Sequence, residues 1–185
     1  MASREPDPRR LDVAAFAADD GELAGELPGD ALPRLVAATL APVDRAERPP
    51  VRWRVVGARR VLEGAGLQPA LDVDASTDVL LECQRCLQPM TLALHAERRI
   101  FFVDGEDAAA ALDAEVEDDV LAMTPALDVR TLVEDELLLA LPIVPRHEVC
   151  PQPLPRAFVD DDPAVEPGDH PFAALAALKQ GSRPN

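Results

Sequence analysis

Three cysteines and one histidine are the residues of this chain whose types and spacing best suit a specific chemistry. Cys83 and Cys86 form a Cys-x-x-Cys pair, and a later stretch reads His147-Glu-Val-Cys150. Three thiolates and one imidazole make a complete tetrahedral ligand set for Zn²⁺. The residues therefore predict a zinc site with a structural role, with Cys83, Cys86, His147 and Cys150 as its ligands.

Two other interpretations of the cysteines are open at this point. A thiol oxidoreductase places its Cys-x-x-Cys pair at the start of a helix, where the thiolate pKa falls. Strand-like patterns flank Cys83 and Cys86 on both sides instead, which disfavours redox catalysis. The other interpretation is reduced structural cysteines without metal, because an odd cysteine count argues against a disulfide framework.

The segments that must position these ligands alternate between apolar and polar residues, which is the period of a strand. The longest alternation covers 71–81, and shorter ones cover 51–55 and 90–103. The Gly64-Ala65-Gly66 stretch is expected to turn the first strand into the second. The Cys-x-x-Cys pair then falls at the tip of the hairpin that follows.

Helix signals flank these strands. Asp30 can cap a short helix that ends before Pro42, and Asp128 can cap a longer one that ends before Pro142. The carboxylates at 134–136 are expected on the exposed side of this second helix. With a further edge strand expected over 11–16, the sequence predicts an α+β fold: an antiparallel β-sheet of about four strands with flanking helices.

Composition divides the chain into three parts. Proline and charge predict disorder over 1–10, and a single α+β domain is expected over 11–158. Within it, 104–119 is rich in carboxylates and has no basic residue, so we expect a solvated loop there. An acidic tail over 159–185 is expected to carry a short C-terminal helix that begins near Pro171.

The basic residues concentrate in one region, where they are candidates for contacting a phosphate or a partner: Arg52, Arg54, Arg59 and Arg60. The alternative is a solvated sheet face. Alternation places arginines on one side of the first strand and aspartates such as Asp72 on one side of the second, so antiparallel pairing would give cross-strand ion pairs.

The net charge of −16, from 34 acidic and 18 basic residues, disfavours non-specific binding to DNA or RNA and favours a basic protein partner. No apolar run reaches the length needed to span a bilayer, and the N-terminus lacks the order of a signal peptide, so we expect a cytoplasmic protein without a membrane partner. Phosphate-binding glycine loops, nucleophile elbows and His-Glu-x-x-His motifs are absent from the sequence, and we therefore expect no enzyme activity.

Three segments together resemble a known family. They are Leu81-Glu-Cys-Gln-Arg-Cys-Leu87, then Val133-Glu-Asp-Glu-Leu-Leu-Leu-Ala-Leu-Pro142-Ile-Val-Pro145 with His147 and Cys150 after it, and Pro171-Phe-Ala-Ala-Leu-Ala-Ala-Leu-Lys179. In this order they are similar to the bacterial YceD family, also called the large ribosomal RNA subunit accumulation protein family. The resemblance implies a cytoplasmic, non-catalytic protein needed for normal amounts of 23S ribosomal RNA.

Two functional hypotheses follow from the residues and the resemblance. The first is a factor in large ribosomal subunit biogenesis that supports synthesis, processing or stability of 23S rRNA. Its partner would be the large-subunit precursor, contacted through a basic ribosomal protein or through the rRNA. The second is a zinc- or thiol-dependent sensor that controls ribosome production without binding the particle.

Overall fold

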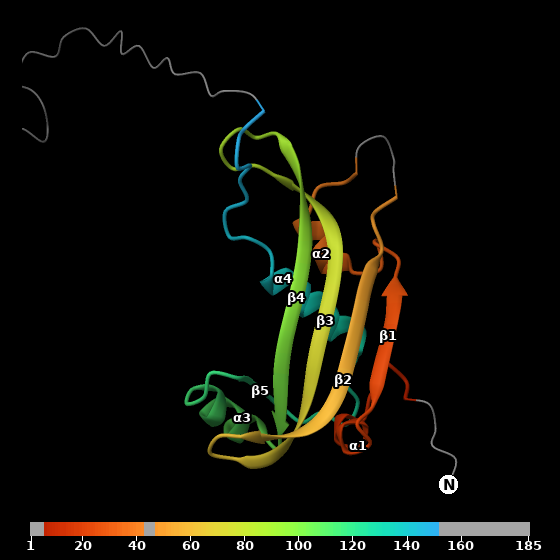
Figure 1. Cartoon of the computed structure of the whole chain (residues 1–185), viewed down its shortest axis with the longest axis vertical. Helices are drawn as coiled ribbons and strands as arrows, with labels where there is room; N and C mark the ends of the chain where they lie inside the picture. Colours follow the sequence, from red (N-terminus) through yellow and green to blue (C-terminus); the bar gives the residue numbers. More distant parts are fainter. Residues whose placement is uncertain (1–5, 43–46, 152–185) are drawn as a thin grey trace, which may run out of the picture. The chain divides into compact units, whose positions relative to one another are not determined.

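The computed structural model describes residues 6–42 and 47–151, and the expected C-terminal tail over 159–185 lies outside them. The fold is α+β, with a five-stranded sheet in the order β1-β2-β3-β4-β5 (Figure 1). The strands are β1 (Glu22–Leu27), β2 (Val51–Leu62), β3 (Gly66–Glu82), β4 (Pro89–Val103) and β5 (Asp119–Ala122). The helices are α1 (Val13–Ala18), α2 (Pro33–Ala38), α3 (Glu106–Asp113) and α4 (Val129–Leu139).

The three long strands pair as the alternation predicts. β2 and β3 are antiparallel and joined by the expected glycine turn, in which Gly64 and Gly66 have φ values of 78° and 74°. Positive φ is strained for any residue with a Cβ, so the turn depends on glycine. β3 and β4 are also antiparallel, and their register runs without a skipped residue from Ala70 opposite Phe101 to Glu82 opposite Pro89.

The expectation of an antiparallel sheet of about four strands needs correction, because the sheet is mixed and has five. β5 pairs with the end of β4 in parallel. The strand expected over 11–16 is wrong as well: most of it belongs to α1, because the Asp12 carboxylate accepts a hydrogen bond from the Ala15 amide and caps a helix there. The first strand is β1 instead, which follows α1 in the chain.

The acidic segment 104–119 also differs from the expected loop. It contains α3, whose first turn carries Glu106 and Asp107, where carboxylates interact favourably with the positive end of a helix. The alanine run inside it has high helix propensity. Buried Ala109 packs with Phe101 and Val120 in a small apolar cluster, so part of this segment is core rather than solvated loop.

The main core lies between one face of the sheet and the helices α1, α2 and α4. In Figure 1, α2 and α4 lie behind the strands, and no described helix covers the face toward the viewer. Asp128 caps α4 as expected, with its carboxylate accepting from the Arg130 amide at 2.9 Å. No helix in the described part of the chain is long and apolar enough to cross a membrane.

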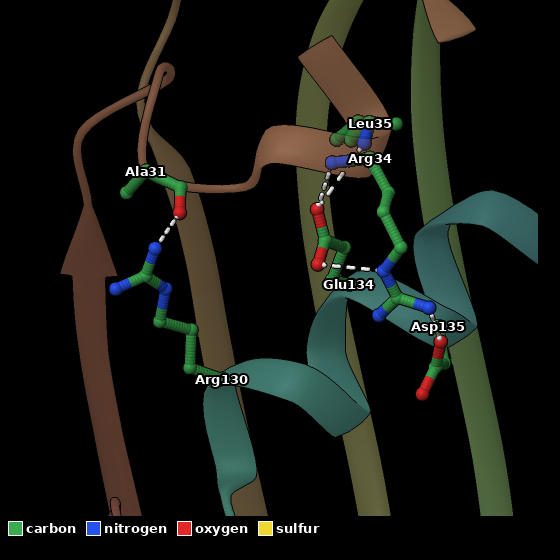
Figure 2. Close-up of polar contacts among 6 residues, drawn as sticks. All are labelled: Ala31, Arg34, Leu35, Arg130, Glu134 and Asp135. Carbon is green, nitrogen blue, oxygen red and sulfur yellow. Dashed lines mark hydrogen bonds and ion pairs between the residues drawn. The ribbon is translucent and has the colours of Figure 1, made fainter. Parts of the chain in front are cut away.

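Two of the three α4 carboxylates do not lie on the exposed face that the sequence suggests. Glu134 and Glu136 are both buried. Figure 2 shows the Glu134 carboxylate directed at the start of α2, where it accepts from the amides of Arg34 at 2.6 Å and Leu35 at 3.2 Å. Because α2 has no side-chain cap of its own, Glu134 satisfies N–H groups that the helix leaves free.

Two arginines complete this junction between α2 and α4. The Arg34 guanidinium reaches back to Glu134 at 3.1 Å and to Asp135 at 2.5 Å. From the start of α4, the Arg130 guanidinium donates to the Ala31 carbonyl (Figure 2). Helix α4 is therefore fixed over the sheet before the chain continues to His147.

Candidate metal centre

The first pair of candidate ligands lies in the connection between β3 and β4. The Cys83 amide donates to the Gln88 carbonyl at 3.0 Å, and the Leu87 amide donates to the Cys83 carbonyl at 2.8 Å. Leu87 adopts a positive φ of 58°, which reverses the chain within this short connection. These bonds hold Cys83 and Cys86 in one rigid turn.

The second pair follows α4, and backbone and side-chain bonds attach it to the first. The Gln84 amide donates to the Pro145 carbonyl at 2.9 Å. The Arg85 guanidinium donates to Cys150 Sγ at 3.0 Å and to the carbonyls of His147 and Glu148 at 3.0 and 3.4 Å. The segment carrying His147 and Cys150 is thereby folded against the Cys-x-x-Cys turn.

The structure brings all four predicted ligands together. Their ligand atoms lie within 4.8 Å of one another. Cys83 Sγ and Cys150 Sγ are 4.0 Å apart, and Cys86 Sγ is 3.4 Å from His147 Nδ1. A tetrahedral zinc ion with Zn–S bonds of about 2.3 Å separates its ligands by roughly 3.8 Å, so the spacing fits zinc. It is far too long for a disulfide, and all three cysteines are free.

The electrostatics of the cluster favour a thiolate at its centre. Burial raises the pKa of Cys83, but backbone N–H groups of His147, Cys86 and Arg85 that point at its sulfur outweigh burial and bring the pKa down to about 5. The pKa of Cys86 is raised, by burial and by the neighbouring sulfurs of Cys150 and Cys83. Cys83 therefore loses its proton readily, and Cys86 loses its proton less readily. This difference is expected where thiols lie close together and a bound cation would balance the charge of several thiolates.

The predicted arginine candidates lie elsewhere, on β2. Arg52 pairs with Glu26 at 3.5 Å, Arg54 with Glu22 at 2.8 Å and Arg60 with Asp72 at 2.5 Å. Within the described residues, Arg59 forms no ion pair. The expected cross-strand ion pair is therefore present at Arg60, whereas Arg52 and Arg54 pair with carboxylates on β1.

Two features of these regions were missed by reasoning from the sequence. The carboxylates Glu22 and Glu26 belong to a strand whose alternation, Glu22-Leu-Ala-Gly-Glu26-Leu, was hidden by its glycine and short length. Arg85 was passed over as a spacer between the cysteines. The signal that could have identified Arg85 is its positive charge between two cysteines. Three thiolates on one Zn²⁺ ion carry a net negative charge, which a neighbouring guanidinium would balance.

Comparison with known proteins agrees with the three matching segments. The family described as "Large ribosomal RNA subunit accumulation protein YceD" matches residues 71–179, a range that includes all four candidate ligands. A Haemophilus influenzae protein of that name is 39% identical over 108 residues, which are 56% of this chain and 61% of the relative. No solved structure matches the chain. With more than half of its length matched by the family, this chain belongs to the YceD family.

Proposed function

We propose that this chain is a non-catalytic factor that supports the accumulation of large-subunit ribosomal RNA, through synthesis, processing or stability of 23S rRNA. The observation that carries the proposal is the family match over residues 71–179, which includes β4, α4 and the whole metal centre. The name of the H. influenzae relative states the same role for that protein.

In this proposal Cys83, Cys86, His147 and Cys150 hold a structural Zn²⁺ ion. The ion would link the β3–β4 connection to the segment after α4. The complete burial of Cys83 supports a structural role, because oxidants and substrates reach a buried sulfur poorly. The alternative of a thiol sensor receives support only from the lowered pKa of Cys83.

The proposed partner is the large-subunit precursor. The net charge of −16 favours contact with a basic ribosomal protein over contact with 23S rRNA. Arg52, Arg54 and Arg60 already pair with carboxylates, which supports the same choice, because a phosphate would have to displace these partners.

Removal of the gene for this chain from its host is the direct test. We expect a fall in 23S rRNA relative to 16S rRNA, restored by the wild-type chain, and co-sedimentation of the tagged chain with precursors of the large subunit in low salt. An unchanged rRNA ratio, or absence from every ribosomal fraction, would overturn the proposal.

Complementation with variants separates the metal from the rest of the function. Cys83→Ser is expected to fail and Arg59→Ala, an exposed β2 residue without an ion pair in the described residues, is expected to succeed. If Cys83→Ser restores 23S rRNA fully, the metal centre is dispensable for this role. If it stays folded, binds the particle and alters only the response to zinc or oxidant, the sensor hypothesis gains.

A further inference from the structure

Strand β4 has a partner along nearly its whole length on one side only. β3 pairs with residues 89–101 of β4, whereas β5 pairs with only Ile100–Val103 on the other side. In Figure 1, β4 forms the side of the sheet, and β5 lies beside one end of it. Among the described residues, the stretch of β4 that precedes Ile100 therefore presents an open strand edge, which we call the open β4 edge.

The direction of its backbone groups can be worked out from one hydrogen bond. The Val103 carbonyl accepts from the Met123 amide, on the β5 side. Because strand residues alternate and the register has no skipped residue, the N–H and C=O groups with the parity of Val103 point the same way. They belong to five residues with exposed side chains: Thr91, Ala93, His95, Glu97 and Arg99. No backbone bond from these five to a segment outside the sheet exists in the described structure.

Natural sheets protect such edges with short strands, prolines or charges, because a row of free backbone groups invites another strand. The opposite edge follows this rule: β1 has six residues, and its Glu22 and Glu26 are both ion-paired. From Met90 to Ala96 the open β4 edge has His95 as its one ionisable residue. This stretch has the composition of a strand that accepts a partner rather than one that repels it.

On the helix-covered side of the open β4 edge, α4 carries an exposed apolar side chain, Leu139. Glu136 lies on the flank of α4 that faces β4, since its carboxylate is 3.4 Å from the Arg98 guanidinium. Leu139 is one turn further along the same flank, and 72% of it is exposed. A strand added at the edge would place every second side chain over this flank, where an apolar residue would cover Leu139.

On the face of β3 and β4 without helices, three carboxylates have no ion-pair partner in the described residues: Asp78, Glu82 and Glu97. Asp78 lies on β3 opposite Ala93. The small Ala93 side chain leaves the path to Asp78 open, and a strand added beside β4 would lie about 10 Å from β3. A lysine or arginine on that strand can span most of this distance, whereas a short side chain cannot.

We propose that the open β4 edge binds an extended segment of a partner protein that alternates basic and apolar residues, as an additional strand of the sheet. The row of free N–H and C=O groups can be satisfied by a polypeptide strand. Glu97 and Asp78 favour basic side chains on the face of the sheet without helices. Leu139 favours apolar side chains on the face that the helices cover. This inference rests on the proposed function in one respect: the proposed function places the partner among the basic proteins of the large-subunit precursor.

The test uses the purified full chain and a synthetic probe, acetyl-Lys-Val-Arg-Val-Lys-Val-Arg-amide. Amide hydrogen exchange is expected to slow on probe binding at the edge-facing residues Thr91, Ala93, His95 and Glu97, and not at the residues between them, which β3 already protects. The same peptide N-methylated at every residue cannot donate a backbone hydrogen bond to the edge in either strand direction, and it is the negative control. A peptide with glutamate in place of its basic residues should bind more weakly than the probe.

A matched pair of variants tests the edge itself. Ala93→Pro removes an edge-facing N–H without removing a bond to β3, and is expected to weaken probe binding at least about tenfold, which corresponds to about 1.4 kcal/mol. Ala93→Ser keeps the N–H and a small side chain, and should bind like the wild type. Equal melting midpoints of the two variants show that the loss is not unfolding.

Four results would overturn the inference. They are edge amides already protected without probe, protection that grows with the concentration of the chain itself and so indicates a second copy, protection on β1 instead of β4, and equal binding by Ala93→Pro and Ala93→Ser. Displacement of the probe by an oligoribonucleotide that leaves these amides unprotected would assign the face to RNA and also overturn it. Because the components are purified, a failed rRNA experiment in cells leaves this outcome unaffected, and the two proposals can fail separately.

Discussion

The two ends of the β3–β4 pair are held together by different forces. At the α3 end, Phe101, Val120 and Ala109 are 2%, 4% and 4% exposed and pack as an apolar cluster. At the cysteine end, buried Cys83 is surrounded by polar contacts, whereas the nearby Leu87 and Val149 are 63% and 85% exposed. The first end buries apolar surface and the second leaves it in water.

This difference indicates where a metal ion would add the most stability. Burying a side chain such as Phe101 contributes about 2–3 kcal/mol, so a few such residues can order the short α3 and β5. The segment after α4 buries little apolar surface, and hydrogen bonds alone contribute about 1 kcal/mol each against the entropy of ordering the chain. A metal linking four ligands would supply what the apolar contacts at this end lack.

The largest effect is expected from removing a ligand at the cysteine end. Cys83→Ser and Cys150→Ser should each abolish zinc binding and lower the thermal midpoint by on the order of 10 °C or more. Metal analysis of protein purified without chelator and calorimetry measure the two effects. Comparing the two variants is the control: if the cysteines are structural without metal, loss of buried Cys83 would destabilise the fold and loss of half-buried Cys150 would not.

The next effect is expected at the opposite end. Phe101→Ala should cost about 3–5 kcal/mol of unfolding free energy in urea titrations, because it leaves a cavity between β4, β5 and α3. A strong chelator should change the stability of the wild type and leave this cost the same. Leu121→Ala, at a β5 position that is 43% exposed, is the matched control and should change stability far less. A cost for Phe101→Ala that depends on chelator would mean that the two ends are not independent.

A smaller effect is expected at the junction that lies between the ends. Glu134→Gln should cost about 2–3 kcal/mol, because the buried amides of Arg34 and Leu35 lose a charged acceptor. Asp135→Asn, one residue along and half exposed, is the matched control and should be nearly neutral. Equal losses for the two variants would show that Arg34, and not the capping of α2, carries the contribution of this junction.

The smallest effect concerns pH and the open face of the sheet. Burial raises the pKa of Asp72, but hydrogen bonds from Arg99 and Arg60 outweigh it and hold the pKa below its usual value. A lowered folded-state pKa contributes stability above the unfolded pKa of about 3.9, and this stability is lost as pH falls below that value. After solvent screening we expect about 0.5–1 kcal/mol.

Thermal midpoints between pH 7 and pH 3 measure this contribution. Asp72→Asn should lower the midpoint at pH 7 and flatten its fall in acid. Asp74→Asn, at the next position of the same face, is the control, because its carboxylate contacts His95 rather than two arginines. A wild-type acid response that is unchanged in Asp72→Asn would place the pH dependence at other carboxylates of the chain.

The sequence by itself determined the features that depend on neighbouring residues. Alternation predicted the strands from Val51 to Val103. The turn at Gly64 and Gly66 is also confirmed, with positive φ values that glycine adopts without strain. The cap at Asp128 depends on residues within one turn and is also confirmed. The four candidate ligands are recognisable by residue type, which is a property of the sequence.

Tertiary structure decided what depends on residues far apart in the chain. The parallel pairing of β5, the burial of Glu134 against α2 and the contact of Arg85 with Cys150 each join segments that no local period relates. The zinc hypothesis shows the division best. Residue type supplied the ligand set, but only the folded chain brings His147 and Cys150 within 4.8 Å of Cys83 and Cys86. A thiol becomes a ligand when folding supplies its neighbours, and sequence spacing alone does not fix that distance.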